Sequence, residues 1–309
     1  MGYLKEAFKH SWQQIRSALS FFLAFLGLLS ILFDKEILLF PICISVGIIL
    51  IVALILIIQR YKTLKKGEVT QVLPHNHQVT LIRKDYQLCA DQLLHSFTSK
   101  QLESFVMVMG VDRTGLMAKN SKTGVAYYMM DYLDANYTVN GGTPREEIQR
   151  QIDEYKKEHH FEDKLPYREC IDIHLTLLPK EGQGSPIPCN LLMVVNSEKK
   201  SNGKGLINDG KGNLVIPTVY DHLHDSDQYE SMLIPIIGSN GLEEPYLSIF
   251  SQIVNQLVWK GEGRKAQHIR HVYVAIREQD YQERWEVSLS QIESFLRACS
   301  EYYPKKYNQ

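Results

Sequence analysis

Two long apolar runs close to the N-terminus constrain this chain more than any other feature of its sequence. The first covers residues 17–33 and the second residues 37–58, and only Asp34, Lys35 and Glu36 separate them. Crossing the roughly 30 Å hydrocarbon core of a bilayer takes about 20 apolar residues in a helix. The second run carries no charged residue and reaches that length, and the first is close to it. Because the connector is too short to cross back through the bilayer, the sequence predicts a two-helix transmembrane hairpin over 17–58.

Three other interpretations compete with this hairpin. A cleaved signal peptide has a shorter apolar region followed by a small-residue cleavage site, whereas here a second, longer run follows. A buried core hairpin would need an uncharged helix longer than an ordinary core helix. A signal anchor with a single true span is the third alternative. The length of the second run favours the hairpin.

Basic residues flank both apolar runs and predict their orientation. An excess of Lys and Arg marks the cytoplasmic side of a membrane segment. The flanking basic residues are Lys5, Lys9 and Arg16 before the first run and Arg60, Lys62, Lys65 and Lys66 after the second. We therefore expect a two-pass protein of a bacterial inner (plasma) membrane with both termini in the cytoplasm. The expected divisions are a cytoplasmic segment (1–16), the hairpin (17–33 and 37–58), a juxtamembrane linker (59–78) and a cytoplasmic domain (79–309).

The charge balance and the cysteines disfavour several classes of protein. The chain has 34 basic and 35 acidic residues, which is not the footprint of a nucleic-acid-binding protein. No two cysteines have C-x-x-C spacing, so the sequence predicts no zinc site. Scattered thiols are typical of a reducing compartment and agree with a cytoplasmic domain. The five cysteines are Cys43, Cys89, Cys170, Cys189 and Cys299.

Strand and helix patterns alternate along the domain that follows the linker. Residues 105–109 (FVMVM) are continuously apolar, which is typical of a strand buried on both faces. Thr143, Pro144 and Glu146 predict a helix start, with Thr as the cap and Glu three residues later. The alternation predicts an α/β layered domain with a largely parallel or mixed sheet. Further strands are expected at 79–82, 171–178, 190–195, 231–237 and 272–276, further helices at 85–104, 124–133, 247–257 and 292–299, and an exposed turn or insertion at 196–214.

Two glycine-bearing loops follow predicted strands and are the candidate ligand sites. Ligands of α/β sheets bind beyond the carboxyl ends of the strands, and the loops at 110–115 and 238–241 occupy that position. Glycines let backbone N–H groups approach an anion closely, and a following helix adds its positive end. Ordinary strand-to-helix turns are the alternative interpretation. Neither loop has the P-loop or the dinucleotide-binding pattern, which disfavours nucleotide hydrolases of those classes.

Other polar clusters predict no further site. His222, His224, Asp225 and Asp227 lie close together, but their spacing matches no zinc or calcium pattern, and we expect a loop there. The pair at 159–160 suits the end of a charged helix, where cations favour the helix dipole. The sequence contains no recognisable nucleophile motif, so no catalytic residue and no metal ligand is predicted.

Short motifs between residues 78 and 300 resemble a macro domain, the α/β module that binds ADP-ribose. Asp85, in the run Lys-Asp-Tyr, stands where the family has the Asp that holds the adenine amino group. Gly124 and Val125 stand where a Gly-Val pair begins the helix beside the diphosphate. The run IPIIGSNG at 234–241 is similar to the second phosphate loop of the family, with one extra residue between the glycines. The resemblance implies as ligand-binding residues Asp85, Gly110, Val111, Asp112, Gly124, Val125, Pro235, Gly238, Ser239, Asn240 and Gly241.

One departure from the family pattern bears on activity. Hydrolytic macro domains typically carry Asn-Ala-Ala-Asn after the second strand, and Val111, Asp112 and Arg113 stand there instead. A carboxylate near a diphosphate is repulsive unless Arg113 or a cationic group on the ligand offsets it. The departure favours a binding protein that is not an enzyme. A membrane-tethered ADP-ribosyl hydrolase or nucleotide-processing enzyme is the alternative, and a protein-interaction module is a third.

Two spans followed by a macro-like domain are similar to the membrane effectors of bacterial Thoeris anti-phage defence. This resemblance implies a three-layer macro-like domain at 79–309 that senses an ADP-ribose derivative, possibly histidine-linked, made by a TIR-domain enzyme. It also implies that the chain forms a homo-oligomer and disrupts the lipid bilayer after binding. No bound cofactor and no nucleic-acid partner are expected.

Overall fold

The computed structural model divides the chain into two units. One consists of Met1–Val69 and Val287–Glu293, and the other of Thr70–Glu286 and Ser294–Gln309. The residues described are 12, 16, 20, 51–59, 61–62, 68–73, 77–116, 124–180, 184–199, 206–207, 210–211, 214–226, 228–237, 246–259, 268–277 and 289–307.

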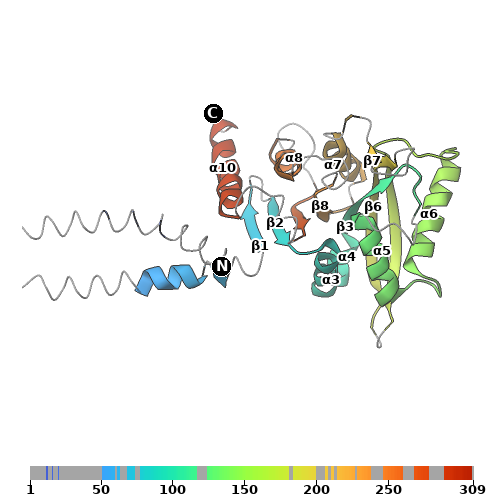
Figure 1. Ribbon diagram of the computed structural model, residues 1–309, viewed down its shortest axis with the longest axis horizontal. Coiled ribbons are helices and arrows are strands. Elements are labelled where there is room, and N and C mark those ends of the chain that lie inside the picture. The colour runs from blue at the N-terminus through green and yellow to red at the C-terminus, as the bar shows by residue number, and fades with distance from the viewer. Residues whose placement is uncertain are drawn as a thin grey trace, which may run out of the picture. The chain divides into compact units, whose positions relative to one another are not determined.

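The strands form one mixed sheet (Figure 1). The strand order is β1-β2-β9-β8-β3-β6-β5-β4, and β7 pairs with β6. From β2 to β6 in this order the neighbours are parallel, whereas β5 is antiparallel to β6. The predicted α/β domain with a mixed sheet is confirmed. The strands are β1 (Glu68–Val72), β2 (Gln78–Arg83), β3 (Phe105–Asp112), β4 (Tyr137–Thr138), β5 (Cys170–Pro179), β6 (Ile187–Lys199), β7 (Leu206–Ile207), β8 (Ser231–Pro235) and β9 (His271–Ile276).

Helices cover both faces of the sheet, and Figure 1 shows α3 and α5 below the central strands and α7 and α8 above them. Met107 and Met109 of β3 are fully buried in one core cluster with residues of α3, α5 and α6. Since side chains alternate between the faces of a strand, Asp172 of β5 points away from this cluster, and it contacts His222 of α7. The helices are α3 (Tyr86–Ser96), α4 (Ser99–Glu103), α5 (Val125–Asn136), α6 (Pro144–Glu158), α7 (Val215–Ser226), α8 (Tyr246–Trp259) and α10 (Leu289–Tyr307).

Three local predictions need correction. The helix expected at 85–104 is two helices, because Thr98 begins α4 with its own capping box to Gln101. The segment at 196–214 is not wholly a turn, since β6 continues to Lys199 and pairs with β7. The polar cluster around His222 lies on helix α7, where apolar residues at helical spacing bury the opposite side. By contrast, the capping box at Thr143 is confirmed, with α6 beginning at Pro144.

The expected N-terminal transmembrane hairpin is also corrected. In the described part of the chain, no helix is long and apolar enough to cross a membrane. Residues 51–59 are helical. Residues 17–33, apart from Ser20, and residues 37–50 lie outside the described residues. The described residues therefore form an α/β domain with a mixed sheet, and they contain no transmembrane hairpin.

A buried guanidinium joins α5 to α6. The side chain of Arg145 is 5% exposed and forms ion pairs with Asp131 and Asp134 of α5, the latter at 2.8 Å between Nε and Oδ2. The backbone N–H of Arg145 also donates to Asp134 Oδ1 at 3.0 Å. The guanidinium is buried whereas the Asp131 and Asp134 carboxylates are 47% and 23% exposed, so its hydrogen bonds to them hold a buried charge in place. Arg145 therefore fixes how the two helices pack.

We expect Arg145→Met to lower the free energy of unfolding by about 2 kcal/mol in urea titrations, because Met keeps the apolar stem but removes the hydrogen bonds of the guanidinium to both carboxylates. Arg150→Met is the matched control, since Arg150 pairs with Glu147 and Glu154 on the exposed side of the same helix. Exposed pairs contribute little, so this control should unfold close to the wild-type urea midpoint. Equal losses in both variants would show that the Arg145 cluster does not join the helices.

Candidate functional site

Strands β3 and β8 separate at their carboxyl ends. They pair only from Phe105 with Ser231 to Met107 with Leu233. Beyond that point β3 continues to Asp112 beside β6, and β8 continues to Pro235 beside β9. The chain after β3 leads to β5 and β6 on one side, and the chain after β8 leads to β9 on the other. This is a topological switch point, the place where α/β sheets bind ligands.

Tyr86 closes the base of this gap between the strands. Its hydroxyl lies 2.9 Å from the carbonyl oxygen of Val108 in β3 and 3.3 Å from that of Leu233 in β8. Tyr86 is the first residue of α3, which begins shortly after β2 ends. Burial, followed by the nearby Cys189 and Cys89, raises the pKa of Tyr86 well above its ordinary value, so the hydroxyl keeps its proton. The single hydroxyl proton of Tyr86 is therefore shared between one carbonyl of each strand at the point of separation.

Asp85 stands directly before α3, at the same edge of the sheet. It is the N-cap residue of that helix, but its side chain makes no capping hydrogen bond. The carboxylate is half-buried. Asp85 follows the end of β2, and its carboxylate does not have the capping role that Asp usually has at such a position. Its contact to a ligand stays a prediction.

The loop after β3 is a fixed turn. The Asp112 carboxylate accepts a hydrogen bond from the Thr114 backbone N–H at 2.8 Å and another from the Thr114 hydroxyl. Gly115 has φ +63°, and a Cβ there would lie 3.0 Å from side-chain atoms of Ile152 and Leu165. Val111 is 5% exposed and belongs to the core cluster. Because the Val111 side chain is buried in the core, only the backbone of Val111 could contact a ligand.

Arg113 does not offset the charge of Asp112. Its guanidinium lies 3.1 Å from Glu198 Oε2, donates to the Leu165 carbonyl at 2.8 Å and stacks 4.7 Å from the centre of the Tyr167 ring. Hydrogen bonds from Lys164 and then Arg113 lower the pKa of Glu198. The positive charge of Arg113 is thus paired with Glu198 of β6.

Gly124 begins α5 with a backbone conformation that favours glycine, at φ +111° and ψ 152°. No side chain caps the first turn of this helix. The backbone of Asn136, its last residue, accepts from Lys180 just after β5, at the amino edge of the parallel strands. The Gly124–Val125 end of the helix therefore faces the carboxyl edge, with backbone N–H groups that suit an anion.

The loop after β8 is described only in part. Pro235 pairs with Ala275 of β9, and Ile236 and Ile237 after it are buried. Gly238, Ser239, Asn240 and Gly241 lie outside the described residues. The structure therefore places the strand that leads into this loop at the carboxyl edge, beside the gap between β3 and β8.

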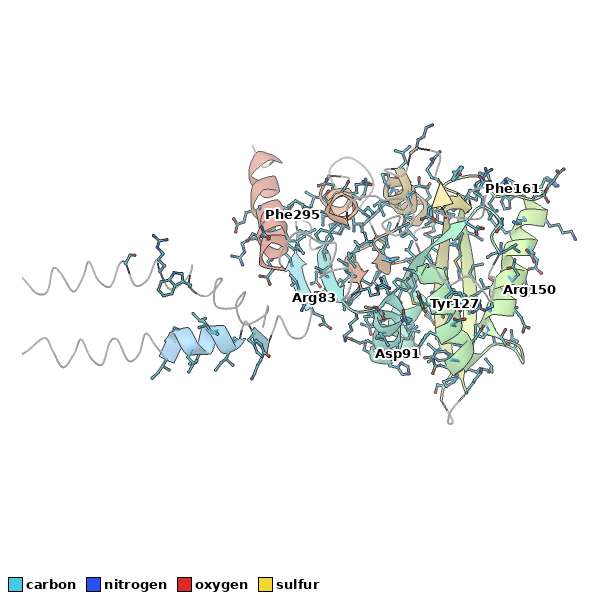
Figure 2. The ribbon with its side chains drawn as sticks, viewed as in Figure 1. Arg83, Asp91, Tyr127, Arg150, Phe161 and Phe295 are labelled. Carbon is cyan, nitrogen blue, oxygen red and sulfur yellow. The ribbon has the colours of Figure 1, made fainter. Side chains whose placement is uncertain are left out.

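The sequence analysis did not identify three polar residues that lie at the carboxyl edge. Arg83 ends β2 and is 4% exposed (Figure 2), and Arg277 follows the neighbouring strand β9. These two arginines place positive charge at the same edge as the predicted anion site. Asn196 lies near the end of β6. Each arginine follows an apolar run that the sequence analysis had predicted to be a strand. This pattern could have indicated both arginines as residues of the carboxyl edge.

The histidine cluster on α7 has a structural partner. His222 Nε2 lies 2.7 Å from Asp172 Oδ2, and this contact raises the pKa of His222. Asp172 belongs to β5, which β6 separates from β3. The contact joins α7 to the sheet and lies two strands away from the gap.

The sequence matches no protein-family model and has no significant match among curated proteins. The chain is similar in structure to a mutant of the Oceanobacillus iheyensis macrodomain, with a TM-score of 0.46 and 11% identity over 75% of this chain and 94% of that chain. A second mutant of that macrodomain, with ADPR, has a TM-score of 0.44 and 11% identity over 74% and 97%. For the poly(ADP-ribose) glycohydrolase from Thermomonospora curvata the TM-score is 0.43 and the identity 9%, over 78% and 82%. These likenesses concern the fold alone.

We expect Tyr86→Phe to lower the free energy of unfolding by about 1–2 kcal/mol, because it leaves two buried carbonyls without their donor. Tyr220→Phe is the control, since the buried Tyr220 hydroxyl donates to one carbonyl, that of Ile253, at 3.2 Å. Thermal and urea unfolding measure both changes. A loss for Tyr86→Phe no larger than for Tyr220→Phe would contradict the role of Tyr86 in bridging the two strands.

Proposed function

We propose that this chain binds an ADP-ribose-derived nucleotide at the carboxyl edge of the sheet, in the gap between β3 and β8. The separation of these two strands at a topological switch point carries the proposal. The motifs that resemble a macro domain include residue 85 after the end of β2, residues 124–125 at the start of α5 and residues 234–235 at the end of β8. The separation of β3 and β8 and the macro-like motifs thus both support a site at the carboxyl edge of the sheet.

The parts of the ligand follow from the chemistry of this edge. Backbone N–H groups at Gly124 and Val125, and those of residues 238–241, would hold the diphosphate. The arginines at the ends of β2 and β9 add positive charge that favours an anionic ligand. Asp85 would accept a hydrogen bond from the adenine amino group. Gly110, Val111 and Asp112 would line the side of the site formed by β3.

Binding without hydrolysis is the form of this function that we favour. Burial raises the pKa of Cys170 and of Cys189 to about 12, so neither thiol supplies a thiolate near neutral pH. One oxygen of Asp112 is engaged by Thr114 in a turn, and His222 is paired with Asp172 two strands from the gap. The groups described here therefore suit the recognition of a nucleotide better than its cleavage.

Calorimetry of the full-length chain with ADP-ribose tests the proposal. We expect saturable heat, no product by chromatography, and no binding for Gly238→Glu, because the new carboxylate would conflict with the diphosphate. Ser185→Glu is the control, since it adds the same charge at an exposed position before β6, at the amino edge of the sheet.

Binding retained by Gly238→Glu would overturn the site. Release of a product from ADP-ribose would favour the hydrolase, and heat with no nucleotide at all would favour a protein-interaction module.

The resemblance to Thoeris effectors suggests a biological role for this binding. We propose that the ligand is a signal made by a TIR-domain enzyme, possibly a histidine-linked ADP-ribose, and that its binding favours a homo-oligomeric state. A ligand shifts such an equilibrium only by binding one state more tightly than the other.

Light scattering of the full-length chain measures this shift. With the ligand, the mass should rise to a multiple of the 35.6 kDa chain, and Gly238→Glu should remain at the mass of the unliganded protein. An unchanged mass at saturating ligand would contradict assembly while leaving binding intact.

A further inference from the structure

Helix α6 holds the turn that follows β3. Lys156 Nζ donates a hydrogen bond to the Thr114 carbonyl oxygen and lies 3.5 Å from that of Asp163. Gln149 Nε2 lies 3.4 Å from the carbonyl oxygen of Gly115. Positions 149 and 156 lie two helical turns apart on the same face of α6. Two side chains of one helix therefore bind two successive carbonyls of this turn.

Gly115 lets the turn lie directly on α6. Its φ of +63° favours glycine, and a Cβ there would lie 3.0 Å from Ile152 Cγ2 and 3.6 Å from Lys156 Cε. Ile152 is fully buried. The apolar stem of Lys156 is thus part of the packing, and its ammonium group adds the hydrogen bond to the backbone.

Every backbone N–H and carbonyl of residues 113–115 has a partner within the protein. Such a turn has no backbone N–H left for an anion, in contrast to the start of α5, which no side chain caps. Its conformation is set before any ligand is present. The partners are the Ser197 carbonyl and the Leu165 N–H for Arg113, the Asp112 carboxylate and Lys156 for Thr114, and the Asp112 carbonyl and Gln149 for Gly115.

We infer that Lys156 is a positioning residue of the proposed nucleotide site, because it holds the turn after β3 as a fixed wall beside the ligand. Ordering a loop on binding costs affinity, and a loop that is already fixed avoids this cost. Lys156 acts through the backbone of Thr114 and does not itself contact the ligand. The inference rests on the proposed nucleotide binding.

Calorimetry of the full-length chain with ADP-ribose tests this role. Lys156→Met keeps most of the apolar stem beside Gly115 but removes the ammonium group. We expect it to bind ADP-ribose about fivefold more weakly, because the turn must then be ordered on binding. Lys156→Arg keeps a cationic donor and should retain most of the wild-type affinity.

Amide hydrogen exchange at Gly115 separates positioning from a general loss of stability. In the wild type this amide donates to the Asp112 carbonyl at 3.0 Å and should exchange slowly with or without ADP-ribose. In Lys156→Met it should exchange faster in the free protein, and ADP-ribose should restore its protection. The amides of the central strand β6 are the reference, and their exchange in the free protein should not change, because the opening is local.

Lys157→Met is the matched control, because it removes the same charge from the next residue of α6, which is exposed. It should bind ADP-ribose as the wild type does. Gln149→Ala removes the other contact from α6 to the turn and gives a second test if Lys156→Met folds poorly. We expect it to weaken binding about twofold.

The outcomes separate this inference from the proposed function. Wild-type affinity in both Lys156→Met and Gln149→Ala, an equal loss in Lys157→Met, or unchanged exchange at Gly115 would overturn the inference and leave nucleotide binding standing. If the wild-type chain does not bind ADP-ribose, both the proposed function and the inference fail.

Discussion

Parallel strands that separate leave backbone carbonyls without a ladder partner, and a buried carbonyl without a donor costs about 1–3 kcal/mol. The hydroxyl of Tyr86 meets this requirement at the end of the β3–β8 ladder, where it lies within hydrogen-bond distance of both strands. Because Tyr86 is the first residue of α3, the same contact fixes the start of that helix and the position of Asp85 before it. The geometry of the candidate site therefore depends on one buried side chain.

Charge at the carboxyl edge is distributed unevenly. Arg83 and Arg277 lie at the ends of β2 and β9, whereas Asp112 ends β3 and Arg113 is paired with Glu198. The basic residues and the carboxylate thus lie at the ends of different strands of the same edge.

Much of the fold was predictable because several helices and strands are each determined by a local sequence pattern. The apolar run at 105–109 predicted β3, and the cap at Thr143 predicted the start of α6. The sequence could not show the separation of β3 and β8 or the position of Tyr86, because both depend on pairing between residues more than a hundred positions apart. The β-bulge at Asn196, where the pairing of β6 with β3 shifts by one residue, was hidden in a stretch rich in Gly, Asn and Lys, which suggested a turn.

Two of the predictions that were wrong have the same cause. Both relied on local composition, without information on how the segment packs in the folded protein. Histidines and aspartates around residue 222 suggested a loop, although apolar residues at helical spacing in the same segment form α7. Hydropathy alone predicted the N-terminal hairpin, whereas no helix in the described part of the chain is long and apolar enough to cross a membrane.

A crystal structure of the full-length chain with ADP-ribose tests the central claim most directly. We expect the diphosphate at the carboxyl edge between β3 and β8, with the adenine beside Asp85. Ligand density on another face of the sheet, or an unoccupied carboxyl edge at saturating ADP-ribose, would contradict it.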